Sequence, residues 1–349
     1  GFSAIISSSD ESVLKVSSGT IEIMGAGSAT LTASVPGTSL SAIQSVTVAK
    51  AVLTVTAENK SRDYGEVNPA LTYNYSGFKN SESASVIDTA PTATTTATVT
   101  SNVGTYPITA SGGTDNNYTF SYTAGTLTVT KATPTATADN KSRVYGDANP
   151  SLTLTYTGFK NNESASVIDT APTATTTATV TSNVGTYPIT ASCGTDNNYT
   201  FSYAAGTLTV TKATLTATPD KKSRGYGDAN PVFTITYSGF KNNETATMLD
   251  TPPTGSTTAV TGSSVGAYPI SLAGGTDNNY GFTFGSGTLT ITKATITATA
   301  ENKSRVYGDA NPVFTISYAG FKNNETSSVI DSPPVASSTA TVTSNAGSY

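Results

Sequence analysis

The sequence contains no histidine and no tryptophan, and its one cysteine is Cys193. Without histidine, the chain lacks the commonest general base near neutral pH and every catalytic triad that uses an imidazole. A single cysteine excludes an intrachain disulfide and a cluster of thiolate metal ligands. Most hydrolase mechanisms and thiolate zinc sites are therefore excluded, and stability must come from burial.

Charged residues are scarce, at 12% of 349 residues, and 18 Lys and Arg against 23 Asp and Glu give a net charge of −5. The basic residues stand singly, whereas nucleic-acid grooves and membrane-binding patches need clusters of them. No apolar run approaches the ~20 residues of a membrane helix. The start, Gly1-Phe2-Ser3, lacks the basic residues of a signal peptide. We therefore expect an interior fragment of a longer chain, with no nucleic-acid partner and no membrane span.

The dominant feature of the sequence is an internal repeat of 81 residues, which is the first pattern to establish because it decides the fold class. Equivalent residues recur at this spacing without insertions: Lys50, Lys131, Lys212 and Lys293; Tyr64, Tyr145, Tyr226 and Tyr307; Phe78, Phe159, Phe240 and Phe321. Residues 82–111 and 163–192 are identical. We expect repeats at 50–131, 132–212 and 213–293 and a truncated fourth repeat at 294–349, all preceded by a separate segment at 1–49.

Hydrophobic residues within a repeat alternate with Thr, Ser and Asn, which predicts half-buried antiparallel strands. In the first copy these positions are Leu53 and Val55; Leu71, Tyr73 and Tyr75; Ile108 and Ala110; Tyr118, Phe120 and Tyr122; Leu127 and Val129. Residues 80–88 break the pattern and predict a short helix that ends before Pro91. We expect a mainly β repeat with one short helix and a tyrosine-rich core. Stacking of the tyrosines on sugar rings is the alternative, which their core-facing parity disfavours.

The junctions between repeats contain no flexible spacer. Residues 126–136 include no glycine, and the inward positions change from Leu127 and Val129 to Pro134 and Ala136, so the chain must switch faces there. Such a junction bends less than a Gly/Ser linker, which predicts a stiff filament. Each repeat should add about 35–45 Å at ~3.3 Å per strand residue.

Several motifs of the repeat resemble the MBG domain of the Tyr-Gly-X type over about 300 of the 349 residues. They are Lys60-Ser61-Arg62-Asp63-Tyr64-Gly65-Glu66-Val67-Asn68-Pro69, Tyr75-Ser76-Gly77-Phe78, Val103-Gly104-Thr105-Tyr106-Pro107-Ile108 and Asn117-Tyr118-Thr119-Phe120. The resemblance implies a small β-grasp-like fold, an extracellular location on a bacterial cell surface, an adhesin or filament context, and no catalytic or cofactor-binding residues. Among proteins with such repeats, the chain is similar to the gliding-motility adhesins of Bacteroidetes that the type 9 secretion system exports.

Residues 1–49 do not follow the repeat. Two alternating runs flank the Gly25-Ala26-Gly27 turn, and the second contains Ala29-Thr30-Leu31-Thr32. This pattern resembles the C-terminal half of a bacterial Ig-like domain of the second type. The resemblance implies a partial β-sandwich before the first repeat.

Recurring acidic residues are the most enzyme-like feature of the chain, because paired carboxylates can cleave glycosides. In the first copy they are Glu58, Glu66, Glu82, Asp88 and Asp115. An enzyme would rarely be repeated without an insertion that builds a cleft. We therefore interpret these charges as a solvated surface with local ion pairs, and we expect no catalytic, cofactor-binding or metal-binding residues.

Four other patterns have a structural and a functional interpretation. Asp115-Asn116-Asn117 offers one carboxylate to calcium, which prefers several, so a structural Asx turn is favoured. Lys60 and Arg62 could bind an anionic polymer or protect a strand edge against pairing, and we favour the second. The threonines at 92–98 resemble an ice-binding face but recur only once per repeat. A Lys–Asn isopeptide bond has no indicated pair.

Two functions remain. The first is a structural stalk or filament segment of a giant cell-surface adhesin, whose distal tip binds surface or glycan ligands. The second is a multivalent carbohydrate-binding array. The Asp-Thr-Ala sequences at residues 88–90 and 169–171 match the O-glycosylation motif of Bacteroidetes surface proteins, which makes Thr89 and Thr170 candidate glycosylation sites. An Asp-Thr turn without a sugar is the alternative there.

Overall fold

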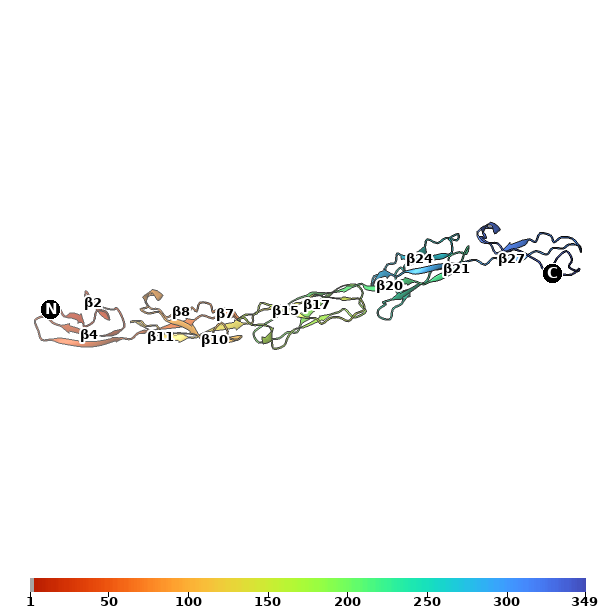
Figure 1. Ribbon diagram of the computed structural model, residues 1–349. Coiled ribbons are helices and arrows are strands. Elements are labelled where there is room, and N and C mark those ends of the chain that lie inside the picture. Colours follow the sequence, from red (N-terminus) through yellow and green to blue (C-terminus); the bar gives the residue numbers. More distant parts are fainter. Residues whose placement is uncertain (1–2) are drawn as a thin grey trace. The chain divides into compact units, whose positions relative to one another are not determined.

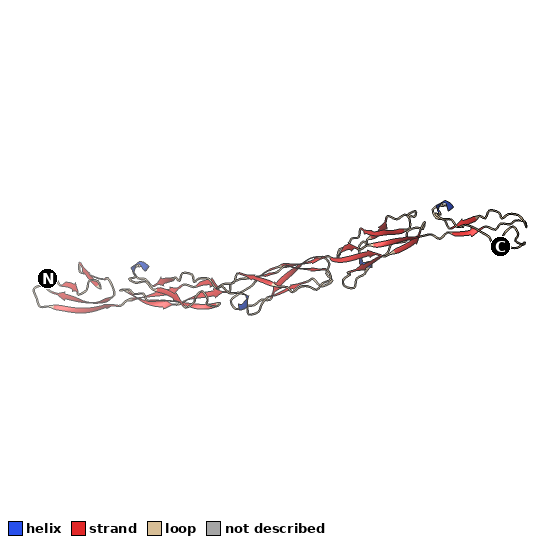
Figure 2. Ribbon diagram, viewed as in Figure 1, coloured by secondary structure: helices blue, strands red, loops and turns tan. Residues whose placement is uncertain are grey.

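The computed structural model describes residues 3–349 and consists mainly of β-strands with a few short helical turns (Figures 1 and 2). It divides into two compact units, each of which is described by itself. The first unit contains the residues up to Asp139 together with 152–175 and 189–206, and the second contains 140–151, 176–188 and 207–349. The division therefore passes through repeat 2, so that each junction between consecutive repeats lies within one unit.

Residues 3–49 form two small antiparallel sheets in the first unit, one in the order β1-β4-β5 and the other a β2–β3 hairpin. The strands are β1 (Ile5–Ser8), β2 (Leu14–Ser17), β3 (Thr20–Ile23), β4 (Gly27–Ser34) and β5 (Ser41–Val48). Val13, Leu14 and Ala29 form the buried centre. The two alternating runs predicted around the glycine-rich turn are β3 and β4, and the resemblance to an Ig-like domain stays a prediction.

Repeat 1 contains two sheets. Its elements are β6 (Ala51–Ala57), β7 (Lys60–Asp63), β8 (Tyr73–Ser76), η1 (Ala84–Val86), β9 (Thr92–Thr95), β10 (Gly104–Ser111), β11 (Tyr118–Thr123) and β12 (Gly125–Thr130). One sheet has the order β11-β6-β8 and the other β7-β12-β10-β9. The two N-terminal strands of the repeat pair in parallel with its two C-terminal strands. β6 pairs with β11 in one sheet, and β7 pairs with β12 in the other.

The two parallel chain paths pass from one sheet into the other at residues 58–59 and 124–125. Gly125 allows the close approach, because a Cβ there would lie 2.5 Å from the Ala57 carbonyl oxygen. Leu53, Val55, Leu127 and Val129 are buried on either side of this crossing. The predicted alternation therefore produces the core, and the mainly β fold with one short helix per repeat is confirmed.

The helix is shorter than the sequence predicted. Asn80 and Ser81 have left-handed φ angles of 52° and 61°, so neither can belong to a right-handed helix. Only the three residues of η1 form a 3₁₀ turn, and Ser83 precedes it in extended conformation. The prediction of a helix over 80–88 was wrong in length, because the Asn/Ser pair forms a tight turn instead of a cap.

Repeats 2 and 3 reproduce these elements. Repeat 2 contains β13 (Thr135–Ala138), β14 (Lys141–Val144), β15 (Leu154–Thr157), η2 (Ala165–Val167), β16 (Thr173–Thr176), β17 (Gly185–Ser192), β18 (Ser202–Ala204) and β19 (Gly206–Thr211). Repeat 3 contains β20 (Ala213–Pro219), β21 (Lys222–Gly225), β22 (Ile235–Ser238), η3 (Ala246–Met248), β23 (Thr254–Thr257), β24 (Gly266–Ala273), β25 (Tyr280–Phe284) and β26 (Gly287–Thr292). In repeat 3 the sheet orders are β22-β20-β25 and β21-β26-β24-β23, so the topology matches repeat 1.

Residues 294–349 contain only β27 (Thr297–Ala300), β28 (Ile316–Ala319) and η4 (Ser327–Val329). Ile296 is 38% exposed, whereas Leu53 at the same position of repeat 1 is fully buried. The positions equivalent to β11 and β12, which cover Leu53 in repeat 1, lie beyond residue 349. These two strands therefore supply much of the burial in a full repeat.

The predicted change of faces at the junction is confirmed. Leu127 and Val129 are buried before the junction, and Ala132, Pro134 and Ala136 are buried after it. The inward parity therefore changes from odd to even over a few residues, without an inserted loop.

Candidate functional site: the junction between repeats

A hydrophobic cluster spans each of the first two junctions between repeats. In the first unit, Tyr64 and Val129 of repeat 1 pack with Ala132, Tyr199 and Phe201 of repeat 2. In the second unit, Tyr145 and Val210 of repeat 2 pack with Ala213, Leu215, Leu249 and Tyr280 of repeat 3. These tyrosines are therefore core residues, as predicted, but part of the core that they build is shared between neighbouring repeats. Tyr122, predicted to face the core by the same alternation, is 38% exposed, so that prediction was wrong.

Glu163 joins two tyrosines at the centre of the first junction. The Tyr64 hydroxyl of repeat 1 donates to Glu163 Oε1 at 2.7 Å, and the Tyr199 hydroxyl of repeat 2 donates to Glu163 Oε2 at 2.5 Å. The two rings meet edge to face with centroids 5.4 Å apart. Each hydroxyl uses one carboxylate oxygen, so the bridge needs an ionised glutamate and two protonated tyrosines.

The environment keeps these hydroxyls protonated. Burial raises the pKa of Tyr199, and the Glu163 carboxylate raises it further, while the Lys160 amide that donates to the hydroxyl at 3.0 Å opposes the shift. Burial and Glu163 raise the pKa of Tyr64 as well. The phenols therefore remain donors throughout the physiological pH range.

The same bridge recurs at the next junctions. Glu244 accepts the hydroxyls of Tyr145 at 2.5 Å and Tyr280 at 2.6 Å. Glu325 accepts the hydroxyl of Tyr226 at 2.5 Å. In repeat 1, Glu82 accepts the hydroxyl of its own Tyr118, and no tyrosine precedes it because residues 1–49 contain none. The bridge between two tyrosines is therefore complete at Glu163 and Glu244, whereas Glu325 and Glu82 each accept one tyrosine hydroxyl.

An asparagine from each repeat caps a loop of the one before it. Asn198 Oδ1 accepts the Val103 amide at 2.9 Å, and Asn198 Nδ2 donates to Asn102 Oδ1 at 3.1 Å. Tyr106 holds this loop, because its hydroxyl donates to the Asn102 carbonyl at 2.9 Å. Asn117 accepts the Ala26 amide at 2.7 Å in the same way. The cap therefore exists at the N-terminal junction, where the tyrosine bridge does not.

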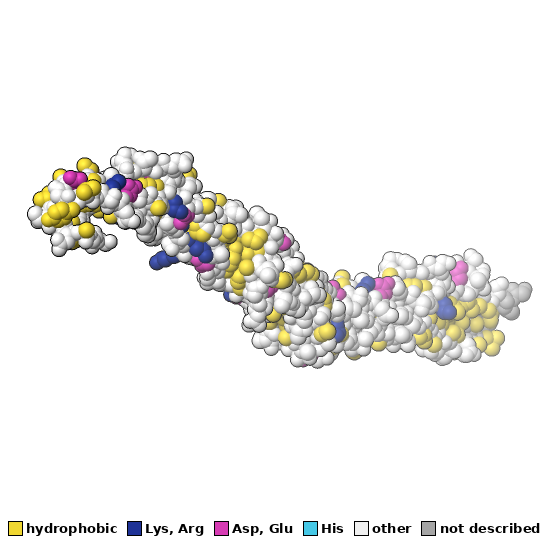
Figure 3. Space-filling model, turned by 90° about the vertical axis from the view of Figure 1, so that its right-hand side faces the viewer, with side chains coloured by type: hydrophobic (Ala, Val, Ile, Leu, Met, Phe, Trp, Pro, Cys, Tyr) yellow, Lys and Arg dark blue, Asp and Glu magenta, His cyan; other side chains and the backbone are white. Residues whose placement is uncertain are grey.

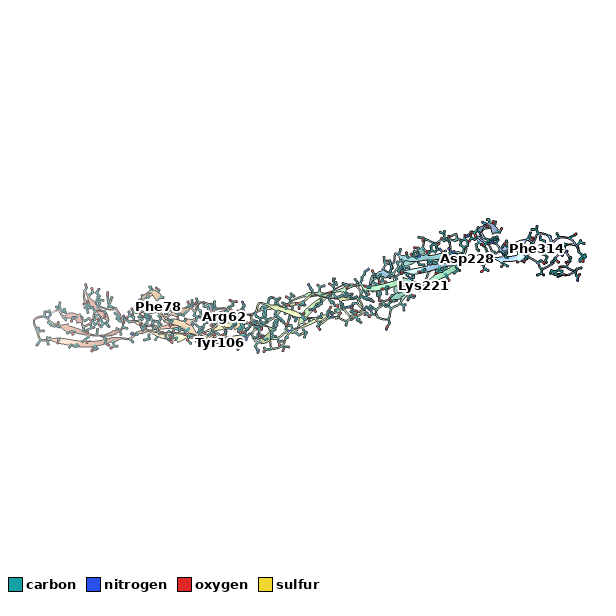
Figure 4. The ribbon with its side chains drawn as sticks, in the orientation of Figure 1. Arg62, Phe78, Tyr106, Lys221, Asp228 and Phe314 are labelled. Atoms are coloured by element: carbon teal, nitrogen blue, oxygen red, sulfur yellow. The ribbon has the colours of Figure 1, made fainter. Side chains whose placement is uncertain are left out.

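A buried arginine supports the Tyr-Gly turn. Arg62 is only 7% exposed, and its guanidinium donates to Asn68 Oδ1 at 2.8 Å, to the Asp63 carbonyl at 3.0 Å and to the Thr98 carbonyl. Asn68 in turn donates to the Ala97 carbonyl at 2.7 Å. Arg62 and Tyr106, labelled in Figure 4, lie toward one end of repeat 1, and Phe78 lies toward the other. The arginine therefore fixes residues 63–68 against the neighbouring loop.

The interpretation of Lys60 and Arg62 as charges that protect a strand edge needs a correction. Both lie on β7, which is an edge strand, but the Arg62 guanidinium points inward and its donors are used within the protein. Lys60 pairs with Glu58 at 2.9 Å. Neither residue therefore presents a free cation to an anionic polymer or to a second edge.

The carboxylates divide into three groups. Glu58 forms the predicted local pair, and the Thr72 hydroxyl, followed by Lys60, lowers its pKa to about 2. Glu66 pairs with Lys160 of the next repeat at 2.5 Å. Glu163, which is equivalent to Glu82 of repeat 1, belongs to the junction bridge, so the interpretation of this recurring glutamate as solvated surface charge was wrong.

Asp115 forms a structural turn. Its Oδ1 accepts the amides of Asn117 at 2.7 Å and Tyr118 at 2.9 Å, and its Oδ2 accepts the Asp88 amide at 3.4 Å. Asp88 accepts the Asn116 amide at 3.0 Å. Hydrogen bonds to main-chain amides therefore engage these carboxylates, as the Asx-turn interpretation predicts. Within residues 3–349, no three acidic or cysteine side chains gather in a way that could hold a metal ion.

The two candidate glycosylation sites lie on the surface. Thr89 exchanges two main-chain hydrogen bonds of 3.0 Å with Thr114, and Thr170 does the same with Thr195. The side chains of Thr89 and Thr170 are exposed. The main chain is held while the hydroxyl faces solvent, so glycosylation there stays a prediction with a sterically open site.

Partly exposed aromatic pairs and shallow hollows are the remaining candidates for a ligand site. Phe120 and Tyr122 stack with centroids 6.2 Å apart, and Tyr122 is 38% exposed. A hollow of about 500 Å³ in repeat 2 is lined by Leu154, Tyr156 and Pro172 among others. A larger one of about 640 Å³ in repeat 4 is lined on one side by residues 300–307. It lies beside the position that β12 fills in repeat 1, so it carries no separate function.

Charged side chains are sparse on the surface, as the composition predicts. On the face shown in Figure 3, basic and acidic side chains lie singly or in small mixed groups among polar and hydrophobic ones. None of the helices between residues 3 and 349 has the length and hydrophobicity to cross a membrane.

Comparison with known proteins identifies the repeat. A family model of the MBG domain (YGX type) matches residues 53–128, 135–209, 215–290 and 296–349. No curated protein matches the chain. Among solved structures, the I9–I11 tandem of titin is similar at 11% identity over 69% of this chain and 100% of that one, with a TM-score of 0.22, too low to support an argument. Because the family model covers well over half of the sequence in four consecutive copies, the chain belongs to the MBG domain (YGX type) family.

Proposed function

We propose that the chain is a structural segment of a bacterial cell-surface adhesin, which holds a distal binding tip away from the cell and performs no catalysis. The observation that carries this proposal is the junction. The first two junctions between repeats share the same bridge, cap and hydrophobic cluster, and the third keeps the Tyr226–Glu325 contact. A binding or catalytic repeat would need a cleft, whereas the Tyr64 and Glu66 side chains of repeat 1 contact the neighbouring repeat. Extracellular location, a gliding-motility adhesin and export by the type 9 system are parts of the same proposal.

A stalk makes a prediction about length. Residues 51–63 form one nearly continuous extended path through repeat 1, which gives about 40 Å at ~3.3 Å per residue. Deleting residues 132–212 removes one period and leaves an identical Lys-Ala junction at the splice. Small-angle scattering of the full chain and the deletion variant should show the maximum dimension fall by about 35–45 Å. A maximum dimension that does not change with repeat number would exclude the stalk.

A second candidate, a carbohydrate-binding array, is supported by three aromatic pairs in which the second ring, Tyr122, Tyr203 or Phe284, is exposed. Phe120–Tyr122, Phe201–Tyr203 and Phe282–Phe284 recur on equivalent strands with centroids 6.2, 6.5 and 6.4 Å apart. Repetition would give avidity to weak stacking on sugar rings. Glycan-array binding by the full chain, lost when Tyr122, Tyr203 and Phe284 are all changed to alanine, would favour this function. Equal binding by both proteins, or none, would reject it.

We further propose O-glycosylation at Thr89 and Thr170, where the exposed hydroxyl can accept a sugar without loss of main-chain hydrogen bonds. Thr251 has the same bridge to Thr276 but is followed by Pro252, so it provides an internal comparison. Peptide mass spectrometry of natively produced protein should find sugar on Thr89 and Thr170 and none on Thr251. Unmodified peptides at the first two sites would leave Asp88 and Asp169 as turn residues only.

A further inference from the structure

The Tyr-Gly-acidic turns of repeats 1, 2 and 3 each contact one loop of the following repeat, and all three residues of the turn take part. At the first junction, Tyr64 reaches Glu163, and Glu66 pairs with Lys160 at 2.5 Å. Gly65 lies between them with φ +79°, and a Cβ at this position would be 2.2 Å from the Lys160 Cβ. The lysine stem therefore packs directly on the glycine main chain.

The contact is the same at the other two junctions. A Cβ on Gly146 would lie 2.3 Å from the Lys241 Cβ, and one on Gly227 would lie 2.2 Å from the Lys322 Cβ. The acidic residue differs, yet the ion pair persists, with Asp147–Lys241 at 2.9 Å and Asp228–Lys322 at 3.0 Å. The receiving loops read Phe159-Lys160-Asn161-Asn162-Glu163, Phe240-Lys241-Asn242-Asn243-Glu244 and Phe321-Lys322-Asn323-Asn324-Glu325.

Each position has a distinct physical requirement. The tyrosine must donate to a carboxylate, the glycine must permit both a left-handed φ and contact with a side-chain stem, and the third residue must be anionic to neutralise the lysine. The receiving loop supplies the complementary groups within five consecutive residues. We infer that the Tyr-Gly-acidic turn is a docking motif, and that its partner is the Phe-Lys-Asn-x-Glu loop of the following repeat. The inference deepens the proposed structural role and rests on it, since docking of this kind serves to fix a neighbour.

Repeat 1 provides a natural control within the chain. Its loop, Phe78-Lys79-Asn80-Ser81-Glu82, has the same groups but follows a segment that contains no tyrosine. Lys79 is exposed and takes part in none of the ion pairs found among residues 3–349, whereas Lys160 is half-buried. Glu82 receives Tyr118 alone. Docking therefore predicts different dynamics for two loops of nearly identical sequence.

Hydrogen exchange of the full chain, read by mass spectrometry, tests the inference. We expect the amides of residues 160–163 to exchange at least tenfold more slowly than those of residues 79–82. Equal rates in the two loops would overturn the docking motif.

Two glycine variants separate docking from backbone strain. Gly65→Ala and Gly112→Ala both place a Cβ at a positive φ, of +79° and +82°, but Gly112 has no neighbouring atom within 4 Å. Gly65→Ala should accelerate exchange at residues 160–163 at least tenfold, and Gly112→Ala should leave it unchanged. The same response to both variants, or to neither, would contradict the inference. Small-angle scattering of the Gly65→Ala variant tests the stalk independently of docking. The stalk proposal predicts an unchanged maximum dimension, because loss of one docking contact need not shorten the chain of repeats.

The ion pair gives a second test that does not depend on glycine. Glu66→Lys should increase exchange in the receiving loop, and the double change Glu66→Lys with Lys160→Glu should restore protection, since the charges are exchanged across the same contact. Failure of the double variant to recover any protection, while both proteins remain folded by circular dichroism, would show that the acidic position is not part of the recognition.

Discussion

Removal of the buried guanidinium in repeat 3 is the sharpest test of how the Tyr-Gly turn is held. Arg224 is 7% exposed and donates to Asn230 Oδ1 at 2.8 Å, the Gly225 carbonyl at 3.1 Å and the Val260 carbonyl at 2.6 Å. Arg224→Met keeps an unbranched apolar stem but removes the guanidinium and every donor. The three acceptors then lose a charged partner in a place that water reaches poorly.

The magnitude follows from the number of bonds and from burial. A hydrogen bond to a charged group contributes about 1.5–3 kcal/mol, and the loss of one partner of a buried charged cluster costs about 3–5 kcal/mol rather than the full sum. A repeat of 81 residues has roughly 4–12 kcal/mol to lose at 0.05–0.15 kcal/mol per residue. We therefore expect Arg224→Met to remove about 3–5 kcal/mol, which is between about a quarter and all of the stability of repeat 3.

Hydrogen exchange measured during a urea titration reports the unfolding of each repeat separately. A global signal such as circular dichroism averages over all repeats. Amides of residues 222–230 should lose protection first, and those of repeat 1 should keep theirs. Lys222→Met is the matched control, because Lys222 lies two residues away on the same strand and is only half-buried. A loss below about 1 kcal/mol for Arg224→Met, or an equal loss for both variants, would show that the guanidinium does not hold the turn.

Three further outcomes are expected. Cys193→Gly should stabilise repeat 2 by about 1 kcal/mol in calorimetry, because Cys193 has a φ of +66° that glycine adopts without strain; destabilisation would contradict this. Phe78→Ala should cost about 3–5 kcal/mol, since its ring packs on Tyr118 with centroids 5.6 Å apart, and an unchanged melting profile would show that the packing is unimportant. Burial and Glu244 raise the pKa of Tyr280, so its hydrogen bond contributes fully below the unfolded pKa of about 10 and is lost as pH rises through the folded value. Stability should therefore fall above pH 10, and less steeply in Tyr280→Phe.

Most strands could be predicted from the sequence, because the alternation of hydrophobic and polar residues lies within each strand. Alternation placed β6, β10, β11 and β12, and burial follows the same parity. It did not find β7 or β9, since Lys60–Asp63 is polar and Thr92–Thr95 has no large apolar residue. These two edge strands form by pairing with β12 and β10, and a pairing partner distant in sequence leaves no mark in a short window.

The junction could not be predicted because its contacts join residues about a repeat apart. Tyr64 and Glu163 are 99 positions from each other, so neither predicts the other by periodicity. The signal that was available is the recurrence of Tyr, Gly, an acid, Lys and Glu together in all four copies, whereas surface charges commonly vary between copies. Arg62 was misread for a similar reason, since its acceptors are mostly main-chain carbonyls, which any sequence supplies.

The parallel pairing of the first and last strands determines how a repeat bears tension. The chain enters at Ala51 beside Tyr118 and leaves at Thr130 beside Asp63, so the entry and exit points lie at opposite ends of the paired strands. A pull on both termini loads the ladder in shear, and its hydrogen bonds must yield together, whereas a load across an antiparallel hairpin opens them one at a time. Under flow or traction, the resistance of such a repeat to unfolding depends on the direction in which its hydrogen bonds are loaded. A repeat can therefore withstand force even when its free energy of unfolding at equilibrium is modest.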